Sequence, residues 1–332
     1  MHATPTPPPL QLEWLANASA RPAGLRLHAT GSVDPATWAA LAAVPELASL
    51  SGQPGLWLDA STAVALAPET LTAFTAAGVA VLPEGQPQQA DTRWPTGVAP
   101  GALVTGTWYQ QPPASAGASQ AASRARALKL MQLVNADADT RDIEAELRLD
   151  ATLSYHLLRL VNGVALRGQR EIGSFAQAIL LLGRQQLRRW LHLMLFSARD
   201  DDPRAAMLTA RVMLRARTLE LASEALGHDK AAQERAFMAG LFSLLGVLFG
   251  QPLPDVLRPL GLSDELLAAL LRGEGALGAL LARVSQAEAP LAAALPLPVH
   301  DTHTTDLDPT QLTRLQLQAV LWMGETQGSG GH

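Results

Sequence analysis

Residues 238–250 read MAGLFSLLGVLFG, and Ser243 carries the only polar side chain of this run. A helix that is apolar on every side is typical of a protein core. Gly240 and Gly246 would let neighbouring helices approach closely, and the Ser243 hydroxyl can donate to the backbone carbonyl four residues earlier. The run therefore predicts one central helix at the middle of a helical core.

The helical pattern continues on both sides of this run. Leu153, Leu157 and Leu160 recur at helical spacing, and Ser263 predicts the N-cap of a later helix. The segment Asp308-Pro309-Thr310-Gln311 resembles a capping box at the start of the last helix. Glycines stand where helices are expected to end, at positions 163, 183, 227 and 250. Helix thus follows helix through this part of the chain.

The first third of the chain has a different pattern. Short apolar runs flanked by turn residues predict strands at 25–29, 55–60, 78–82 and 102–108. Asp34-Pro35 predicts an N-cap followed by proline at the first helical position, and Pro68 opens another helix that Gly78 ends. Strands that alternate with helices favour a small α/β unit with a partly parallel sheet.

These patterns predict an α+β protein of two domains. Residues 1–113 form the α/β domain, and residues 114–122, which are small and polar, form a linker. Residues 123–326 form an all-α domain with a C-terminal helical extension, and residues 327–332 form a flexible tail.

Composition excludes several classes of function. The chain of 332 residues is 48% hydrophobic and 17% charged, which suits a folded protein with a sizeable core. It has no cysteine, so disulfides, thiolate zinc sites and cysteine nucleophiles are excluded. A net charge of −5 without a long basic run argues against nucleic acid as a partner. The N-terminus lacks the pattern of a signal peptide and no apolar run is long enough for a membrane helix, so we expect a cytoplasmic protein.

Ordered blocks of the second half resemble the HDOD family, a non-catalytic relative of the HD-domain phosphohydrolases. Residues 130–163 resemble the opening of that domain, although Ala151 and Gly163 stand where the family has proline and serine. Residues 171–190 resemble the next block, and residues 236–250 then occupy the place of the metal-binding His-Asp pair. The resemblance implies an all-α HDOD fold.

The resemblance extends to EAL–HDOD fusion proteins. Residues 262–288 and 312–323 resemble the C-terminal region of those proteins, and residues 102–113 resemble the last strand and aromatic-x-x-P ending of an EAL domain. EAL domains are related to cyclic di-GMP phosphodiesterases. A closed (β/α)₈ barrel takes about 250 residues. The resemblance therefore implies that residues 1–113 are a truncated, degenerate EAL-like barrel.

The metal site of the HD fold is expected to be lost. Hydrolysis of phosphate esters there needs a distant histidine, the His-Asp pair and a later aspartate as metal ligands. Ser243 and Leu244 stand at the pair, and a neutral hydroxyl is a poor ligand while leucine has none. Residues 213–227, where the first histidine would lie, contain no histidine. The resemblance implies a vacated metal slot at Ser243 and Leu244, and no catalytic residue or metal.

The signature of an active EAL domain is also missing. That activity needs carboxylate and amide ligands at strand ends, a lysine and an E-x-L-x-R motif. Residues 1–113 contain no lysine, and Glu13-Trp14-Leu15 is followed by Asn17 where the motif has arginine. Asp59 ends a predicted strand and so has the position of a catalytic residue, but a cap or turn aspartate is the favoured interpretation.

Two further groups of residues are candidate sites. Arg184, Arg188, Arg189 and Trp190 give a basic, aromatic helix end that could bind phosphate or an acidic partner, against the simpler interpretation of a solvated helix face. His300, His303 and the nearby aspartates up to Asp308 superficially resemble a metal cluster, and a solvated loop is favoured there.

We expect a non-enzymatic bacterial signalling protein whose HDOD domain is a protein–protein interaction module. A link to cyclic di-GMP signalling is implied by the resemblance only. The expected partners are other signalling proteins, a homodimer stays open, and no cofactor is expected. One alternative is a non-catalytic nucleotide receptor, which arginines such as Arg21, Arg26 and Arg93 converging on a pocket would favour. The other is a residual metal-dependent phosphohydrolase that uses ligands from residues 300–308.

Overall fold

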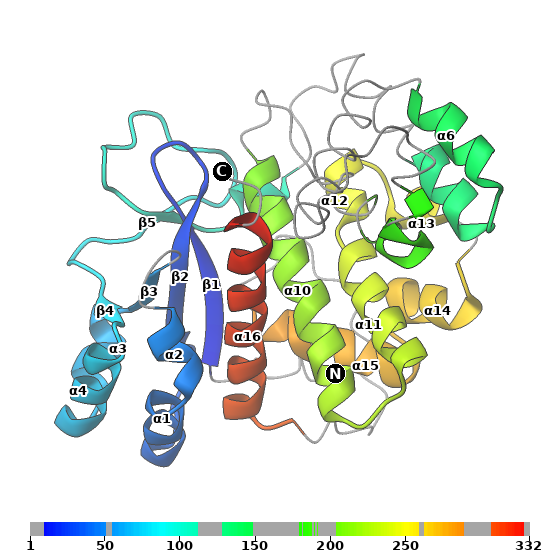
Figure 1. The fold of residues 1–332 in the computed structure, drawn as a ribbon. Helices are drawn as coiled ribbons and strands as arrows, with labels where there is room; N and C mark the ends of the chain where they lie inside the picture. Colours follow the sequence, from blue (N-terminus) through cyan, green and yellow to red (C-terminus); the bar gives the residue numbers. More distant parts are fainter. Residues whose placement is uncertain are drawn as a thin grey trace, which may run out of the picture.

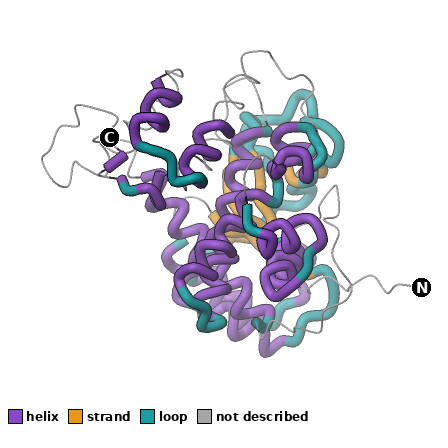
Figure 2. The backbone as a smooth tube through the Cα atoms, turned by 90° about the vertical axis from the view of Figure 1, so that its right-hand side faces the viewer, coloured by secondary structure: helices purple, strands orange, loops and turns teal. Residues whose placement is uncertain are grey.

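The computed structural model of the chain describes two units that pack against each other (Figure 1). One unit contains a sheet with helices and the other contains helices (Figure 2). This confirms the predicted order of an α/β region followed by a helical region. The described residues are 10–50, 55–111, 128–148, 179–180, 182–187, 189, 191, 204–258, 262–288 and 307–328.

The first unit is built on an open, mixed sheet in the order β4-β3-β2-β1-β6-β5. An antiparallel hairpin of β1 and β2 sets Glu13 opposite Arg26 and Leu12 opposite Leu27. β2, β3 and β4 are parallel, while β6 is antiparallel to β1 and parallel to β5. The strands are β1 (Leu10–Ala16), β2 (Pro22–Ala29), β3 (Gly55–Leu58), β4 (Ala80–Val81), β5 (Gln88–Gln89) and β6 (Val104–Thr105). The sheet is thus a half-barrel that contains the four predicted strands together with β1 and β5.

Local signals set the helices of this unit. The Asp34 carboxylate accepts from the Ala36 N–H at 2.8 Å and caps α1, and Pro68 opens α4, as predicted. Gly78 has a φ of +87°, the left-handed conformation that ends α4. The helices are α1 (Pro35–Ala42), α2 (Pro45–Ser49), α3 (Ala60–Ala65) and α4 (Pro68–Ala76), and the short 3₁₀ helix η1 (Trp108–Gln110) follows β6.

The second unit is organised around one long helix, α10. α11, α15 and α16 pack directly against it. Two predicted caps are confirmed: the Ser263 hydroxyl accepts from the Leu266 N–H, and Asp308 and Gln311 form a reciprocal capping box. The named helices are α6 (Thr140–Arg148), α10 (Ala205–Ala225), α11 (Lys230–Phe242), α12 (Leu245–Phe249), α13 (Leu253–Leu257), α14 (Asp264–Arg272), α15 (Gly275–Gln286) and α16 (Pro309–Gly328).

Not every boundary can be compared with its prediction. The linker at 114–122 and the helix end at Gly163 lie outside the described residues. Left-handed glycines at 183, 227 and 250 do follow helical segments, as predicted. α16 runs to Gly328, past the predicted domain end at 326. Within the described ranges, no helix combines the length and apolarity that crossing a bilayer requires.

The two units share an extensive contact. α16 lies beside α10 and beside β1 (Figure 1), and it also packs on α1 and α2. The Leu12 N–H of β1 donates to the Ala287 carbonyl at 3.0 Å, just after α15. Glu46 of the first unit accepts from Arg314 at 2.9 Å and Gln318 at 2.7 Å, both on α16. Backbone and side-chain hydrogen bonds therefore join the half-barrel to the helical unit.

Candidate functional site

The apolar run at 238–250 forms two helices. α11 ends at Phe242, Ser243 is its C-terminal cap, and α12 begins at Leu245. The prediction of a single central helix is therefore wrong. Ser243 and Leu244 are nevertheless buried, with 4% and 2% of their surface exposed. The break turns the Ser243 hydroxyl toward other buried polar groups.

The Ser243 hydroxyl makes two hydrogen bonds. It donates to the Gly240 carbonyl at 2.7 Å, which is three residues back along α11 instead of the predicted four. It accepts from Nη1 of Arg215 at 2.8 Å. Ser243, which is predicted to stand where the HD fold has its histidine, is thus bonded to a guanidinium group.

Arg215 belongs to α10, the helix that would carry the first histidine ligand. Its side chain has 0% of its surface exposed. Nε donates to Oε1 of Glu288 at 2.9 Å and Nη2 donates to Oε2 at 2.6 Å, which is a bidentate ion pair. An arginine side chain stays protonated at any physiological pH. A guanidinium group that is paired with a carboxylate therefore lies against Ser243.

Glu288 holds a second arginine at the same time. Nε of Arg211 donates to Oε2 of Glu288 at 2.9 Å, and both side chains are buried. Burial acts to lower the pKa of the Arg211 guanidinium, but Tyr109 and Glu288 outweigh this effect and raise its pKa above the ordinary value. Arg211 consequently stays charged inside the protein.

Three arginines come from α10 and the turn before it, and we name Arg204, Arg211 and Arg215 the arginine seam. All three are buried. Arg211 donates from Nη1 to the Tyr109 hydroxyl at 2.8 Å, and Arg204 donates to the Gln111 carbonyl. Through Glu288, the seam therefore joins Ser243 to the last turn of the half-barrel.

The seam is not among the sequence predictions, because the metal-ligand pattern at residues 213–227 concerns histidine only. A signal was present, since spacings of seven and four residues put Arg204, Arg211 and Arg215 near one face of a helix. Charged residues on the inner face of an otherwise apolar helix need buried partners. Nothing local marks Glu288 as that partner.

A second charged group lies on the sheet. Arg26 of β2 pairs with Glu13 directly opposite on β1, and its Nη1 donates to Oδ1 of Asp59 at 3.3 Å. The structure thus brings together Glu13 and Asp59, two acidic residues weighed separately in the sequence. Because Arg26 lies between two carboxylates, its charge is already compensated. It is a weak candidate for binding a nucleotide phosphate.

His28 next to this group is expected to make stability depend on pH. Burial and then the Arg26 charge lower the pKa of His28, although Glu13 and Asp59 act in the opposite direction. The unfolded chain has a histidine pKa of about 6.5. Stability from the neutral ring is thus complete above that pH, begins to fall below it, and is lost below the folded pKa. Unfolding in urea at pH 8 and pH 5.5 measures this.

The variant His28→Asn should show a smaller loss of stability on acidification than the natural protein. His228→Asn is the matched control, because His228 is exposed in the loop after α10, and it should keep the natural pH dependence. Equal pH dependence in both variants and the natural protein would contradict the assignment to His28.

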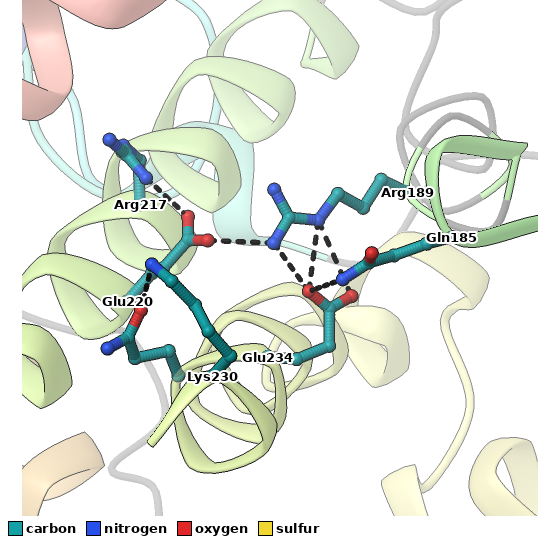
Figure 3. Close-up of polar contacts among 7 residues, drawn as sticks. Gln185, Arg189, Arg217, Glu220, Lys230 and Glu234 are labelled. Atoms are coloured by element: carbon teal, nitrogen blue, oxygen red, sulfur yellow. Dashed lines mark hydrogen bonds and ion pairs between the residues drawn. The ribbon is translucent and has the colours of Figure 1, made fainter. Parts of the chain in front are cut away.

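A third polar group ties helices of the second unit together (Figure 3). Arg189 donates from Nη2 to Glu220 of α10 at 2.7 Å and from Nε to Glu234 of α11 at 3.1 Å. Arg217 pairs with the other oxygen of Glu220 at 2.6 Å, and Gln185 donates to Glu234 at 3.1 Å. Arg189 therefore holds the segment before α10 against both helices.

The structure describes two of the four residues of the predicted basic helix end, Arg184 and Arg189. Arg189 makes the ion pairs just described and is partly buried, with its guanidinium carbon 4.7 Å from the ring centroid of Phe237. Arg184 pairs with Asp137 at 2.8 Å, and its side chain is 36% exposed. Arg188 and Trp190 lie outside the described residues. Arg184 is thus the more accessible of the two described arginines.

The candidate metal clusters can be compared only in part. Residues 300–306 of the candidate cluster lie outside the described residues. Across the rest of the chain that the structure describes, no three His, Asp or Glu side chains gather as a metal site would require. Asp308 is described, and it caps α16.

A known domain family matches part of the second unit. Residues 123–258 match the HDOD domain. The match includes α6, the arginine seam, α11, Ser243 and Leu244, and it ends in the turn after α13. The residues of the half-barrel precede it, so the EAL-like assignment of residues 1–113 remains a prediction.

Two curated proteins resemble the chain over part of its length. A Vibrio cholerae protein named cyclic di-GMP phosphodiesterase CdgJ is 34% identical over 139 residues, 42% of this chain and 32% of that protein. The uncharacterized protein YuxH of Bacillus subtilis is 29% identical over 124 residues, 37% of this chain and 30% of that protein. The chain therefore spans about a third of the length of these relatives. No solved structure matches the chain.

Proposed function

We propose that the chain is a non-enzymatic signalling protein whose HDOD domain binds another protein. The observation that carries this proposal is the guanidinium of Arg215, bonded to Ser243 in the vacated slot. A metal-dependent hydrolase places a divalent cation near the His-Asp pair, with an open position for water. Here a protein cation lies against the slot and Leu244 supplies no ligand.

The half-barrel supports the same proposal. Its central arginine, Arg26, is held by Glu13 and Asp59, so these carboxylates are engaged with a guanidinium group. The two-metal chemistry of an EAL domain needs carboxylates that are free to bind cations. This arrangement also weighs against the nucleotide receptor, which needs arginine charge that is not already compensated.

The signalling context rests on similarity. The Vibrio cholerae relative is named a cyclic di-GMP phosphodiesterase, and the matched segment covers 32% of it. We propose the same signalling system for this chain, without the activity in that name. Fold similarity by itself names no partner.

Two measurements test the absence of catalysis. Purified protein should hold no stoichiometric divalent metal, and it should hydrolyse neither cyclic di-GMP nor bis(4-nitrophenyl) phosphate in the presence of Mg²⁺ or Mn²⁺. Stoichiometric metal together with turnover would overturn the proposal. Turnover that survives Arg215→Met and stops on removal of residues 300–308 would favour the residual hydrolase.

Arg184 provides the test of partner binding. Protein captured from native lysate with the natural chain should bind Arg184→Glu about tenfold more weakly, because reversing one interface charge costs on the order of 1.4 kcal/mol. Titration calorimetry with the captured partner measures the affinity. Arg258→Glu is the matched control, since Arg258 also lies in an exposed ion pair, with Asp255. Equal weakening in both variants would show a general charge effect and contradict a surface at Arg184.

A further inference from the structure

A continuous chain of polar contacts runs from the half-barrel to the vacated slot. The Tyr109 hydroxyl accepts from Arg211 at 2.8 Å, and Arg211 donates to Glu288 at 2.9 Å. Glu288 also accepts from Arg215, which donates to Ser243 at 2.8 Å. Each of these side chains is buried. Tyr109 and Ser243 are thus joined through three charged groups.

The carboxylate at the centre of this chain is itself attached to the half-barrel. Glu288 forms an isolated parallel bridge with Leu12 of β1, next to the bond from the Leu12 N–H to the Ala287 carbonyl. The Gln11 amide donates to the Gln286 carbonyl at 3.2 Å. The position of Glu288 therefore depends on β1, while the groups that it holds belong to α10.

Such a chain of contacts favours two states, one with every buried charge paired and one with the pairing broken, and intermediate states are disfavoured. A buried charge that keeps its partner is stable, and one that loses its partner is strongly disfavoured. A small displacement of η1 or β1 would leave Arg211 or Arg215 without a complete set of acceptors. The buried packing around the seam cannot deform continuously to relieve this. The arginine seam is consequently suited to transmit a discrete change.

We propose that the half-barrel and the HDOD domain form one conformationally coupled body, in which the arginine seam relays the state of Tyr109 to Ser243 and the reverse. The half-barrel then acts as a built-in regulatory subunit of the HDOD domain. A partner that displaces η1, the last turn of the half-barrel, therefore changes how well the backbone around Ser243 is ordered. Because coupling between two sites is reciprocal, a change at the slot must alter the half-barrel equally.

Two conservative variants of the full chain test this proposal by hydrogen exchange read by mass spectrometry. Tyr109→Phe removes one hydroxyl at one end of the chain of contacts, and Ser243→Ala removes one at the other. Thr105→Val and Ser285→Ala are the matched controls: among the described residues, these buried hydroxyls have no hydrogen-bond partner. The thermal midpoint of each variant reports whether it folds.

The expected result is reciprocal. Tyr109→Phe should speed exchange of the amides at 239–249 by at least about threefold, and Ser243→Ala should do the same at 104–111. Their combined effect on the unfolding constant should depart from additivity by at least about twofold, although the two residues do not touch. The controls remove no hydrogen bond within the described part of the chain and should leave exchange in the other unit unchanged. Exchange changes confined to the mutated unit, or additive effects within error, would overturn the proposal.

Discussion

Replacing Glu288 by glutamine is expected to lower the free energy of unfolding by about 3–5 kcal/mol. The change keeps the shape of the side chain and removes its charge. Arg211 and Arg215 both rely on this carboxylate, and both are buried, so two guanidinium groups would lose their counter-ion inside the core. Equilibrium unfolding in urea, followed by far-UV circular dichroism, measures the loss.

Glu274→Gln is the control for this experiment. Glu274 also pairs with an arginine, Arg272, but that pair is exposed at the start of α15, and exposed pairs contribute little. Its urea midpoint should stay at the natural value. A loss of less than about 1 kcal/mol for Glu288→Gln would contradict the assignment of Glu288 as the counter-ion of the seam.

Replacing Gly240 by alanine is expected to cost about 1–3 kcal/mol. A Cβ at this position would lie 2.4 Å from Cα and 2.7 Å from N of Ala216, which are backbone atoms of α10. The two helices would have to separate, and the bond between Arg215 and Ser243 crosses the same contact. The urea midpoint reports the loss, and a lower melting temperature should accompany it.

Gly324→Ala is the matched control for the helix crossing. Gly324 is exposed on α16, and a Cβ there would meet nothing within 4 Å. Since alanine favours helix more than glycine, this variant should gain about 0.5–1 kcal/mol. A gain for Gly240→Ala as well would show that α10 and α11 are not held at close range by that glycine.

Local features of the fold were predictable because their causes lie within a few residues. Asp34, Ser263 and the Asp308–Gln311 pair each satisfy free backbone groups at a nearby helix start, so short motifs suffice to place them. The close approach at Gly240 was also predicted, although Gly246 packs instead on the chain that follows α12.

β1 was missed for a tertiary reason. All seven of its residues are buried, including Gln11 and Glu13, because α10 and α16 both pack against it. A strand that is covered from more than one side, with polar residues satisfied by distant partners, lacks the alternation that marks a half-exposed strand. A strand is recognised in a sequence when polar residues on its solvent-facing side alternate with apolar ones. β1 has no solvent-facing side, so this alternation is missing.

Ser243 and Leu244 show what the chemistry of the residues alone can establish. Neither side chain can replace a His-Asp metal pair, and this follows from their functional groups without any coordinates. The break in the helix at this point did not follow, since the apolar pattern of 238–250 is equally compatible with one helix or two. The contact of Ser243 with the guanidinium group of Arg215 did not follow either.

Those contacts join residues far apart in the chain. Arg215 lies 28 residues from Ser243 and 73 from Glu288, and Arg211 lies 102 from Tyr109. Whether such groups meet depends on how α10, α15 and the half-barrel pack, and no local preference encodes that. The predicted loss of metal ligands therefore follows from the sequence, because it depends on side-chain chemistry alone. The ion pairs around Ser243 depend on packing, and they exist only in the folded chain.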